Sequence, residues 1–182
     1  MKNIIVFVAA GFEEIETIAC VDMLRRAGAR VTMAGLVNGV IEGSRGVKIV
    51  PDCEIEQADS KDCDMIILPG GQPGTTNLQN NDRVKQIICE MNEAGKTIAA
   101  ICAAPLILQS AGILKGRVVT CHPSVRDQLH EVELSESRVE VDGNLITSQS
   151  PGTAMEFALK LIEVLFGKER LAVVEKGVLP KK

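Results

Sequence analysis

The chain has 182 residues, a length typical of one domain that buries roughly 70% of its unfolded surface. Its formal net charge is −4, its Lys and Arg residues are scattered, and it contains no Trp, no Tyr and only four Phe. This composition lacks the basic surface of a nucleic-acid-binding protein and the aromatic side chains that stack on bases or flavins.

The cysteine and hydropathy patterns indicate the compartment. The six cysteines show no C-x-x-C spacing, and no charged segment followed by an apolar segment and a cleavage site opens the sequence. We therefore expect a cytoplasmic protein with reduced thiols. The uncharged stretch between Lys96 and Lys115 is shorter than the ~20 apolar residues of a membrane-spanning helix, and Pro105 interrupts it. It predicts a buried strand followed by a helix, and we expect no membrane partner.

The first half of the chain alternates predicted strands with predicted helices. The apolar run NIIVFVAA at residues 3–10 is typical of a strand covered on both faces. Residues 13–27 carry apolar side chains at helical spacing and basic residues in the last turn, and Gly28 follows as the stop. The same criteria predict strands at residues 29–36, 47–50, 63–71 and 96–101, and a helix at residues 82–94.

The second half continues this alternation without a repeat, linker or low-complexity segment. We therefore predict one α/β domain over residues 1–182, with a mostly parallel sheet and helices on both faces. The predicted elements are a helix between Cys102 and Gly112, a strand at residues 116–121, a hairpin at residues 137–149 around Asp142-Gly143, and a long helix from just after Pro151 to Gly167.

Three loops carry the candidate chemistry, because ligands of such sheets bind beyond the carboxyl ends of the strands. The loops are AAGFEEIE, PGGQPG and CAAP. Cys102 is predicted to lie on a sharp strand-to-helix turn, where a helix N-terminus favours a thiolate that is nucleophilic near neutral pH. Its position alone leaves open the alternative of a buried, inert thiol. We assign that alternative to three other cysteines, Cys20, Cys63 and Cys89.

The acidic residues of the first loop have two possible roles. Glu13 and Glu16 share a helix face, whereas Glu14 points elsewhere. Acidic residues are common in a first helical turn because they complement the dipole, and this suffices for Glu13 and Glu14. Glu16 is predicted to face the strand-end crevice. A desolvated carboxylic acid there stays protonated, donates a hydrogen bond to the sulfur and transfers protons.

The glycine-rich loop lacks the Lys-Ser/Thr ending of a phosphate-binding loop and the G-x-G-x-x-G of a dinucleotide site. We predict instead that the backbone amides of Gly71 and Ala103 form an oxyanion hole. Of the two histidines, His122 either orients or protonates a substrate or lies on a surface loop, and His130 is expected to be solvated. The spacing of the potential ligands predicts no zinc site.

Five motifs occur in order along the chain: GFEEIE, LPGG, AAICAAP, TCHPS and TSQSPGTAMEFAL. Together with the length they resemble the ThiJ/PfpI superfamily, specifically its Parkinsonism-associated deglycase branch. The resemblance covers essentially the whole chain. It implies a flavodoxin-like three-layer sandwich with a nucleophile elbow, a homodimer, and chemistry without a metal or cofactor.

The resemblance also implies roles for individual residues. The reactive cysteine at the elbow corresponds to Cys102, and the protonated glutamate paired with it corresponds to Glu16. His122 falls near the pocket. The arginine that reaches the site of the neighbouring subunit corresponds to Arg45 in GSRG.

Related branches of the superfamily fit less well. In the protease-like branch a histidine directly follows the nucleophile, whereas this chain has Ala103, so the Cys-His pair that activates peptide hydrolysis is absent. Glutamine amidotransferases require a downstream His and Glu that HPSVRDQLHE does not convincingly supply.

Two functional hypotheses remain. The first, implied by the resemblance, is a cysteine-dependent glyoxalase or deglycase that acts on methylglyoxal and its adducts, a small α-oxoaldehyde or glycated substrate, and yields lactate. Its intermediate is a Cys102 hemithioacetal, with Glu16 as acid and base. The second is an oxidative-stress sensor or redox-regulated chaperone that acts through oxidation of Cys102.

Overall fold

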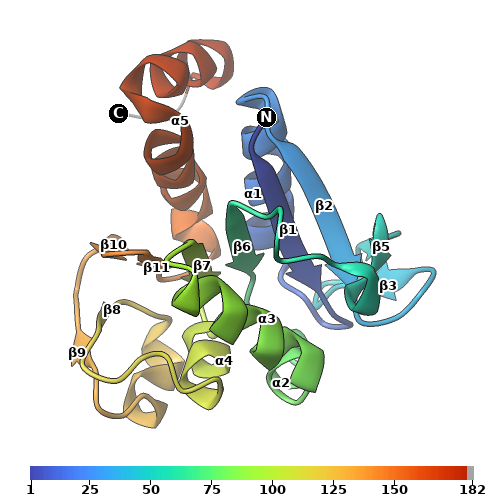
Figure 1. The fold of residues 1–182 in the computed structure, drawn as a ribbon, viewed down its shortest axis with the longest axis vertical. Coiled ribbons are helices and arrows are strands. Elements are labelled where there is room, and N and C mark those ends of the chain that lie inside the picture. The colour runs from blue at the N-terminus through green and yellow to red at the C-terminus, as the bar shows by residue number, and fades with distance from the viewer. Residues whose placement is uncertain (180–182) are drawn as a thin grey trace.

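The central sheet of the protein has seven strands in the order β10-β11-β7-β6-β1-β2-β5 (Figure 1), seen in a computed structural model that describes residues 1–179. Every neighbouring pair is parallel except β10 and β11. The predicted α/β class with a mostly parallel sheet is therefore confirmed. The strands are β1 (Asn3–Val8), β2 (Arg30–Gly35), β5 (Cys53–Glu54), β6 (Met65–Leu68), β7 (Thr97–Ile101), β10 (Val139–Asp142) and β11 (Leu145–Ser148).

Two groups of helices cover the two faces of the sheet and make the three layers. One face packs against α1 and α5, and the other against α2, α3 and α4 (Figure 1). Among residues 1–179, no helix combines the length and the apolar character needed to cross a membrane. The helices are α1 (Glu14–Arg26), α2 (Gly74–Gln79), α3 (Asp82–Glu93), α4 (Pro105–Ser110) and α5 (Ala154–Val178), with single 3-10 turns η1 (Ile55–Gln57), η2 (Pro123–Gln128) and η3 (Pro151–Thr153).

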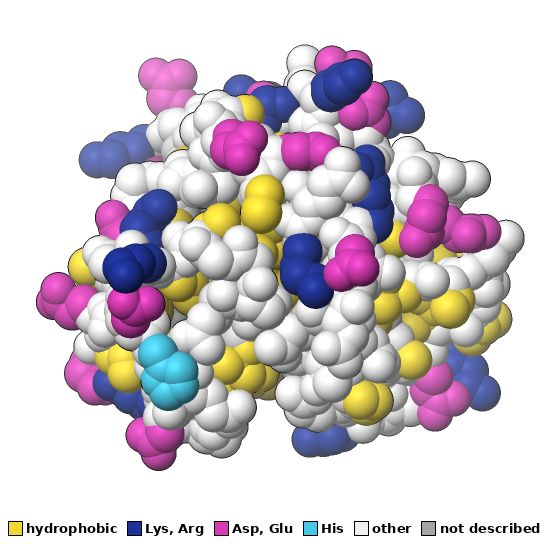
Figure 2. All heavy atoms as spheres, turned by 60° about the horizontal axis from the view of Figure 1, so that its bottom comes forward, with side chains coloured by type: hydrophobic (Ala, Val, Ile, Leu, Met, Phe, Trp, Pro, Cys, Tyr) yellow, Lys and Arg dark blue, Asp and Glu magenta, His cyan; other side chains and the backbone are white. Residues whose placement is uncertain are grey.

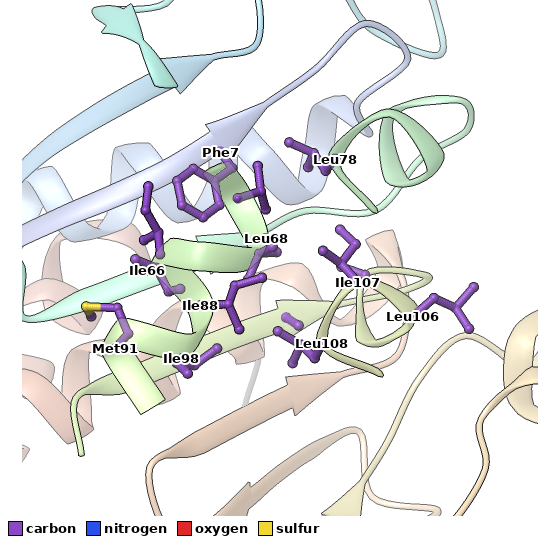
Figure 3. Close-up of a cluster of buried hydrophobic side chains, with 14 of the residues drawn as sticks. Phe7, Ile66, Leu68, Leu78, Ile88, Met91, Ile98, Leu106, Ile107 and Leu108 are labelled. Carbon is purple, nitrogen blue, oxygen red and sulfur yellow. The ribbon is translucent and has the colours of Figure 1, made fainter. Parts of the chain in front are cut away.

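The alternation of side chains along the strands builds a core on each side of the sheet. In β1, Ile4 and Val6 pack towards α1 and α5, whereas Ile5 and Phe7 pack towards the other helices. Figure 3 shows the second of these cores, where Phe7 lies among apolar side chains of β6, α3 and α4. Each fully buried side chain of this size stabilises the fold by about 1.5–3 kcal/mol, so both layers hold the sheet firmly.

Two predicted strands lie outside the central sheet. The run at residues 47–50 contributes only β4 (Lys48–Ile49), which pairs with β3 (Ile41–Glu42). The run at residues 116–121 contributes only β8 (Val118–Val119), which pairs with β9 (Glu133–Leu134). The apolar patterns identified extended segments correctly, but the partner of each segment is set by tertiary contacts that a local pattern does not contain.

The last helix departs from its predicted end. The structure bears out a helix from just after Pro151 to Gly167, where the backbone turns sharply with φ 80° and ψ 174°. A second helical segment then continues to Val178, and we had not predicted it. The exposed Lys, Glu and Arg residues that follow Gly167 weaken the apolar periodicity on which such a prediction depends.

Candidate active site

Three loops meet at one edge of the sheet because β7, β6 and β1 are adjacent and parallel. The loop after β1 leads into α1, the loop after β6 holds Gly70 and Gly71, and Cys102 directly follows β7. These are the three loops that the sequence predicted for the carboxyl edge. On the face at the lower end of Figure 1, towards which β1 runs, side chains of both charges are interspersed and form no area of one sign (Figure 2).

Cys102 lies on a strained turn. Its φ is 65°, a left-handed value that costs a non-glycine residue roughly 1–2 kcal/mol. Two backbone hydrogen bonds hold this geometry: the Cys102 amide donates to the Ser148 carbonyl at 3.0 Å, and the His122 amide donates to the Cys102 carbonyl at 2.9 Å. The chain thus anchors Cys102 to the end of β11 and to the start of η2, and the thiol is half-buried.

Gly70 supplies the space into which the thiol fits. A Cβ atom on this residue would lie 2.7 Å from the Cys102 Cβ, 2.9 Å from Glu16 Oε2 and 3.1 Å from the Ala103 amide nitrogen. Contacts below 3.0 Å are too short for real side chains, so only glycine allows Cys102 and Glu16 to approach. Gly70 is the first glycine of the LPGG motif, yet it was not among the residues predicted for the site.

Glu16 lies in the crevice and is completely buried. Its Oε2 accepts a hydrogen bond from the Gly70 amide at 2.8 Å, and the carboxyl also forms a side-chain hydrogen bond with Cys102, whereas Oε1 has no hydrogen-bond partner among the described residues. Burial raises the pKa of this carboxyl to about 7, and the negative charge of Glu13 also raises it. Near neutral pH a large fraction of Glu16 is therefore protonated.

The thiol of Cys102 does not have the lowered pKa that we expected from a helix N-terminus. Burial raises its pKa to about 12, and the charge of an ionised Glu16 is the second cause. The expectation was wrong because α4 begins only at Pro105, has six residues and lies beyond the turn. Cys102 and Glu16 are instead joined by a hydrogen bond, so the site of their shared proton decides whether a thiolate is present.

The two predicted oxyanion-hole amides lie beside the sulfur. Hydrogen bonds from the amides of Ala103 and Gly71 lower the pKa of Cys102 and partly offset its burial. Gly71 has φ 89°, and a Cβ atom there would lie 2.4 Å from the Glu13 amide nitrogen. Glycine is thus required where this loop crosses the start of α1 and turns its amide towards the thiol.

The two other acidic residues of the first loop have separate structural roles. Glu13 is the N-cap of α1, and its Oε2 accepts from the Glu16 amide at 2.7 Å. Glu14 is only 8% exposed and accepts hydrogen bonds from the Ser44 hydroxyl and the Arg45 amide. From the sequence we explained Glu14 by the helix dipole alone. The burial of Glu14 and its hydrogen bonds show that it also fixes the turn that carries Arg45.

Arg45 and the histidines lie further from the sulfur. The Arg45 side chain is exposed on its turn, and its guanidinium donates to the Ser44 carbonyl at 3.1 Å. The backbone of His122 contacts that of Cys102, while its Nδ1 lies 2.7 Å from the Ser124 hydroxyl and caps η2. His130 is exposed, in line with the solvated position that we predicted.

The remaining cysteines lie outside this group of residues. Cys20 and Cys63 are buried, and burial raises the pKa of both thiols. Cys89 is only partly buried, which departs from the predicted full burial, and its thiol lies 3.5 Å from the Ala111 carbonyl oxygen. All six thiols are free.

Hollows elsewhere on the surface do not include the thiol. Four of them, with volumes from about 170 to about 530 Å³, are lined by residues other than Cys102 and Glu16. Within residues 1–179, no group of three or more His, Cys, Asp and Glu side chains is arranged to hold a metal ion.

Comparisons with known proteins match almost the whole chain. Residues 2–164 match the sequence model of the DJ-1/PfpI family. Protein dj-1beta of Drosophila melanogaster is 43% identical over 181 residues, which cover 98% of this chain and 97% of the relative. Its crystal structure, 42% identical, has a TM-score of 0.96 and covers 100% of this chain and 99% of the other.

Two further relatives bear on the possible chemistry. The glutathione-independent glyoxalase DJR-1.2 of Caenorhabditis elegans is 39% identical over 160 residues, covering 87% of this chain and 85% of the relative. The structure of oxidized Toxoplasma gondii DJ-1 is 36% identical, with a TM-score of 0.96 and complete coverage of both chains.

Proposed function

Since this chain belongs to the DJ-1/PfpI family, we propose that it is a cysteine-dependent, cofactor-independent glyoxalase and deglycase. Its substrates are methylglyoxal and the adducts of methylglyoxal, and its product is lactate. Support comes from the relative described as a glutathione-independent glyoxalase. The observation that carries the proposal is the hydrogen-bonded pair of Cys102 and Glu16 under the amides of Gly71 and Ala103.

The first step is addition of the thiol to the substrate. The Cys102 thiolate attacks the aldehyde carbon of methylglyoxal, a carbon–sulfur bond forms, and the carbonyl oxygen becomes an oxyanion. The amides of Gly71 and Ala103 stabilise this oxyanion, and the protonated Glu16 transfers its proton to give a hemithioacetal. Glu16 is then a carboxylate and is ready to act as a base.

The next steps move hydrogen within the substrate. The Glu16 carboxylate removes the proton from the carbon bonded to sulfur and forms an enediol, and a proton then returns to the neighbouring carbon. The product is a lactoyl thioester of Cys102. Water hydrolyses this thioester, which releases lactate and restores the thiol. The sum is methylglyoxal plus water giving lactate, without an external oxidant or reductant.

The test is to measure lactate produced from methylglyoxal by the wild type and by Cys102→Ala, in buffer free of amines and added thiols. The matched control is Cys89→Ala, which removes a partly exposed thiol outside the site. We expect lactate from the wild type and the control, and none from Cys102→Ala. A wild-type rate in Cys102→Ala, or no lactate from a folded wild type, would contradict the proposal.

Oxidation of Cys102 is a second candidate function, as part of a stress sensor or redox-regulated chaperone. It is favoured by the free Glu16 Oε1, which when protonated donates to an oxygen of a cysteine sulfinate. Mild peroxide followed by mass spectrometry should find added oxygen mainly at Cys102, and Glu16→Leu should remove this selectivity. Preferential oxidation of Cys89 or Cys53 would contradict this function.

We further propose that two copies of the chain form a homodimer in which Arg45 reaches the partner's site. The motivation is a set of exposed apolar side chains on α1 and beside the Arg45 turn, namely Ile15, Ile18, Val47 and Val50. Sedimentation at micromolar concentration should give a dimer. A monomer with full activity would contradict both the dimer and the role of Arg45.

A further inference from the structure

A buried cluster of hydrogen bonds lies in the loop between β11 and α5, with the hydroxyl of Thr153 at its centre. Thr153 is only 1% exposed, and its Oγ1 accepts from the amides of Ser150 at 3.1 Å and Gln149 at 3.3 Å. The same oxygen lies 2.7 Å from Oγ of Ser148, which is also buried. The proposed reaction steps use neither hydroxyl, so the cluster has a different role.

The acceptors around the two hydroxyl groups determine the direction of these bonds. Ser148 Oγ donates its single proton to the Arg138 carbonyl at 2.8 Å. Thr153 has two acceptors, Ser148 Oγ and the Ser150 carbonyl at 2.9 Å. The Ser150 carbonyl already accepts from the Thr153 amide, whereas Ser148 Oγ has no other donor among the described residues. The bonds therefore run from Thr153 through Ser148 to Arg138.

The peptide group between Ser148 and Gln149 connects this cluster to the elbow. Its N–H is the Gln149 amide, which donates to Thr153 Oγ1. Its C=O is the Ser148 carbonyl, which accepts from the Cys102 amide at 3.0 Å. A trans peptide group is planar, and its N–H and C=O point in opposite directions. Holding the N–H therefore also directs the carbonyl towards Cys102.

The strained turn at Cys102 depends on this carbonyl. The φ of Cys102 is the rotation about its N–Cα bond, and 65° is retained because both of its peptide groups are held. The Ser148 carbonyl holds the amide of Cys102, and the His122 amide holds the carbonyl of Cys102. A Ser148 carbonyl without a fixed direction would release the amide side of the turn and displace the thiol from Glu16.

We propose that Thr153 is a positioning residue for the nucleophile. Its hydroxyl fixes the Ser148–Gln149 peptide group, and this group holds Cys102 in the left-handed turn. Thr153 acts only through these neighbours and does not touch the sulfur. The inference deepens the proposed function and rests on it for the effect on turnover. The hold on the Cys102 amide is measured without turnover.

The experiment is hydrogen exchange followed by NMR, with isotope label only at the backbone nitrogens of the six cysteines. The Cys102 amide then gives a signal of its own, and the Cys20 amide inside α1 reports unfolding of the whole domain. Thr153→Val keeps the shape of the side chain but removes the hydroxyl, whereas Thr153→Ser keeps the hydroxyl. The kcat and KM for lactate production are measured for each variant.

The matched control is Ser60→Ala, which removes another buried hydroxyl and its hydrogen bond to Glu90. Ser60 precedes β6 and lies near the amino ends of the strands, whereas Cys102 lies beyond the carboxyl end of β7. This variant therefore loses a buried hydrogen bond without a change at the elbow.

We expect the Cys102 amide of Thr153→Val to exchange about tenfold faster relative to the Cys20 amide, the effect of about one net hydrogen bond. The kcat should fall about tenfold while KM stays unchanged, because the thiol is displaced but the substrate contacts remain. Thr153→Ser should restore both values. Ser60→Ala should leave the relative exchange of Cys102, kcat and KM at their wild-type values.

Three results would overturn the inference. The first is unchanged exchange of Cys102 in folded Thr153→Val, and the second is equal acceleration at Cys102 and Cys20, which would indicate a loss of stability alone. The third is a failure of Thr153→Ser to restore exchange and kcat, which would make the methyl group responsible.

A second variant decides the question if Thr153→Val does not fold. Ser148→Ala breaks the contact with Thr153 Oγ1 but keeps the Ser148 carbonyl, so the Cys102 amide should exchange about threefold faster. No change in this variant would also contradict the inference. Failure of the proposed function is distinguishable, because the wild type then forms no lactate. The exchange of the Cys102 amide still decides whether Thr153 holds the turn.

Discussion

The elbow at Cys102 and the kink at Gly167 turn the chain with the same left-handed φ, but in opposite surroundings. Cys102 has φ 65°, carries a side chain, and is held by hydrogen bonds from two distant segments. Gly167 has φ 80°, is exposed, and a Cβ atom there would meet nothing within 4 Å. One position is crowded and strained, whereas the other is open and relaxed.

The difference shows why glycine occupies one position and not the other. At the kink, glycine removes the conformational strain and nothing else is needed from the residue. At the elbow, the thiol is retained although glycine would relieve the strain, and the neighbouring Gly70 provides the space that the thiol requires. Strain kept at a residue with a reactive side chain is characteristic of functional sites.

The largest expected effect comes from crowding the elbow with Gly70→Ala. The added methyl group would lie within 3.0 Å of both Cys102 and Glu16, so one of them must move. Because displacements of about 1 Å cost roughly 100-fold in rate, we expect lactate production to fall at least that much. Gly152→Ala is the control, since its methyl group lies 3.7 Å from the Ser150 hydroxyl. Equal rates of lactate production in the two variants would show that the site does not require glycine at position 70.

The second expected effect concerns Glu16, the buried carboxylic acid beside Cys102. The folded-state pKa of Glu16 is raised from 4.5 to about 7, so its stabilising contribution is complete below pH 4.5 and is lost as the pH rises through 7. Relative to Glu16→Gln, the free energy of unfolding of the wild type should fall by about 3 kcal/mol between pH 4.5 and 8. Urea unfolding at fixed protein concentration measures this. Parallel pH profiles for the two proteins would show that Glu16 does not titrate as described.

The smallest effect comes from Gly167→Ala, which tests the open, relaxed turn at Gly167. The backbone at φ 80° and ψ 174° is accessible almost only to glycine, so alanine should cost about 1–3 kcal/mol. For a chain of this size each kcal/mol lowers Tm by about 2–4 °C. Gly177→Ala, in the same helix but without a positive φ, should be neutral or slightly stabilising. Lactate production should be unchanged in both, and a stable Gly167→Ala would mean that the kink is not a constraint.

Much of the fold follows from local patterns in the sequence. Buried parallel strands such as β1 are apolar on both faces, and α1 ends where basic residues meet Gly28. The hairpin at residues 137–149 is present as β10 and β11, although its two-residue turn is Gly143-Asn144 and not Asp142-Gly143. The pairing of β3 with β4 and of β8 with β9 was not predictable, because two-residue strands carry almost no periodicity.

Part of the candidate site was predictable, because the carboxyl ends of parallel strands lie at the same edge of the sheet. Cys102 follows β7 and Glu16 follows β1, the two strands that flank β6, so the sequence predicted that both lie at the same edge of the sheet. The roles of Gly70 and Glu14 and the raised pKa of the thiol were missed. They depend on distances and burial between segments that lie far apart in the chain, and no local pattern records these.

The backbone hydrogen bonds of Cys102 to Ser148 and His122 have a consequence for protein synthesis. The cysteine is translated well before either of its anchors, and Ser148 is the last of them to be made. Until β11 pairs with β7, Cys102 lacks its hydrogen bond to Ser148. The strained turn that places the thiol beside Glu16 is therefore complete only after β11 has joined the sheet.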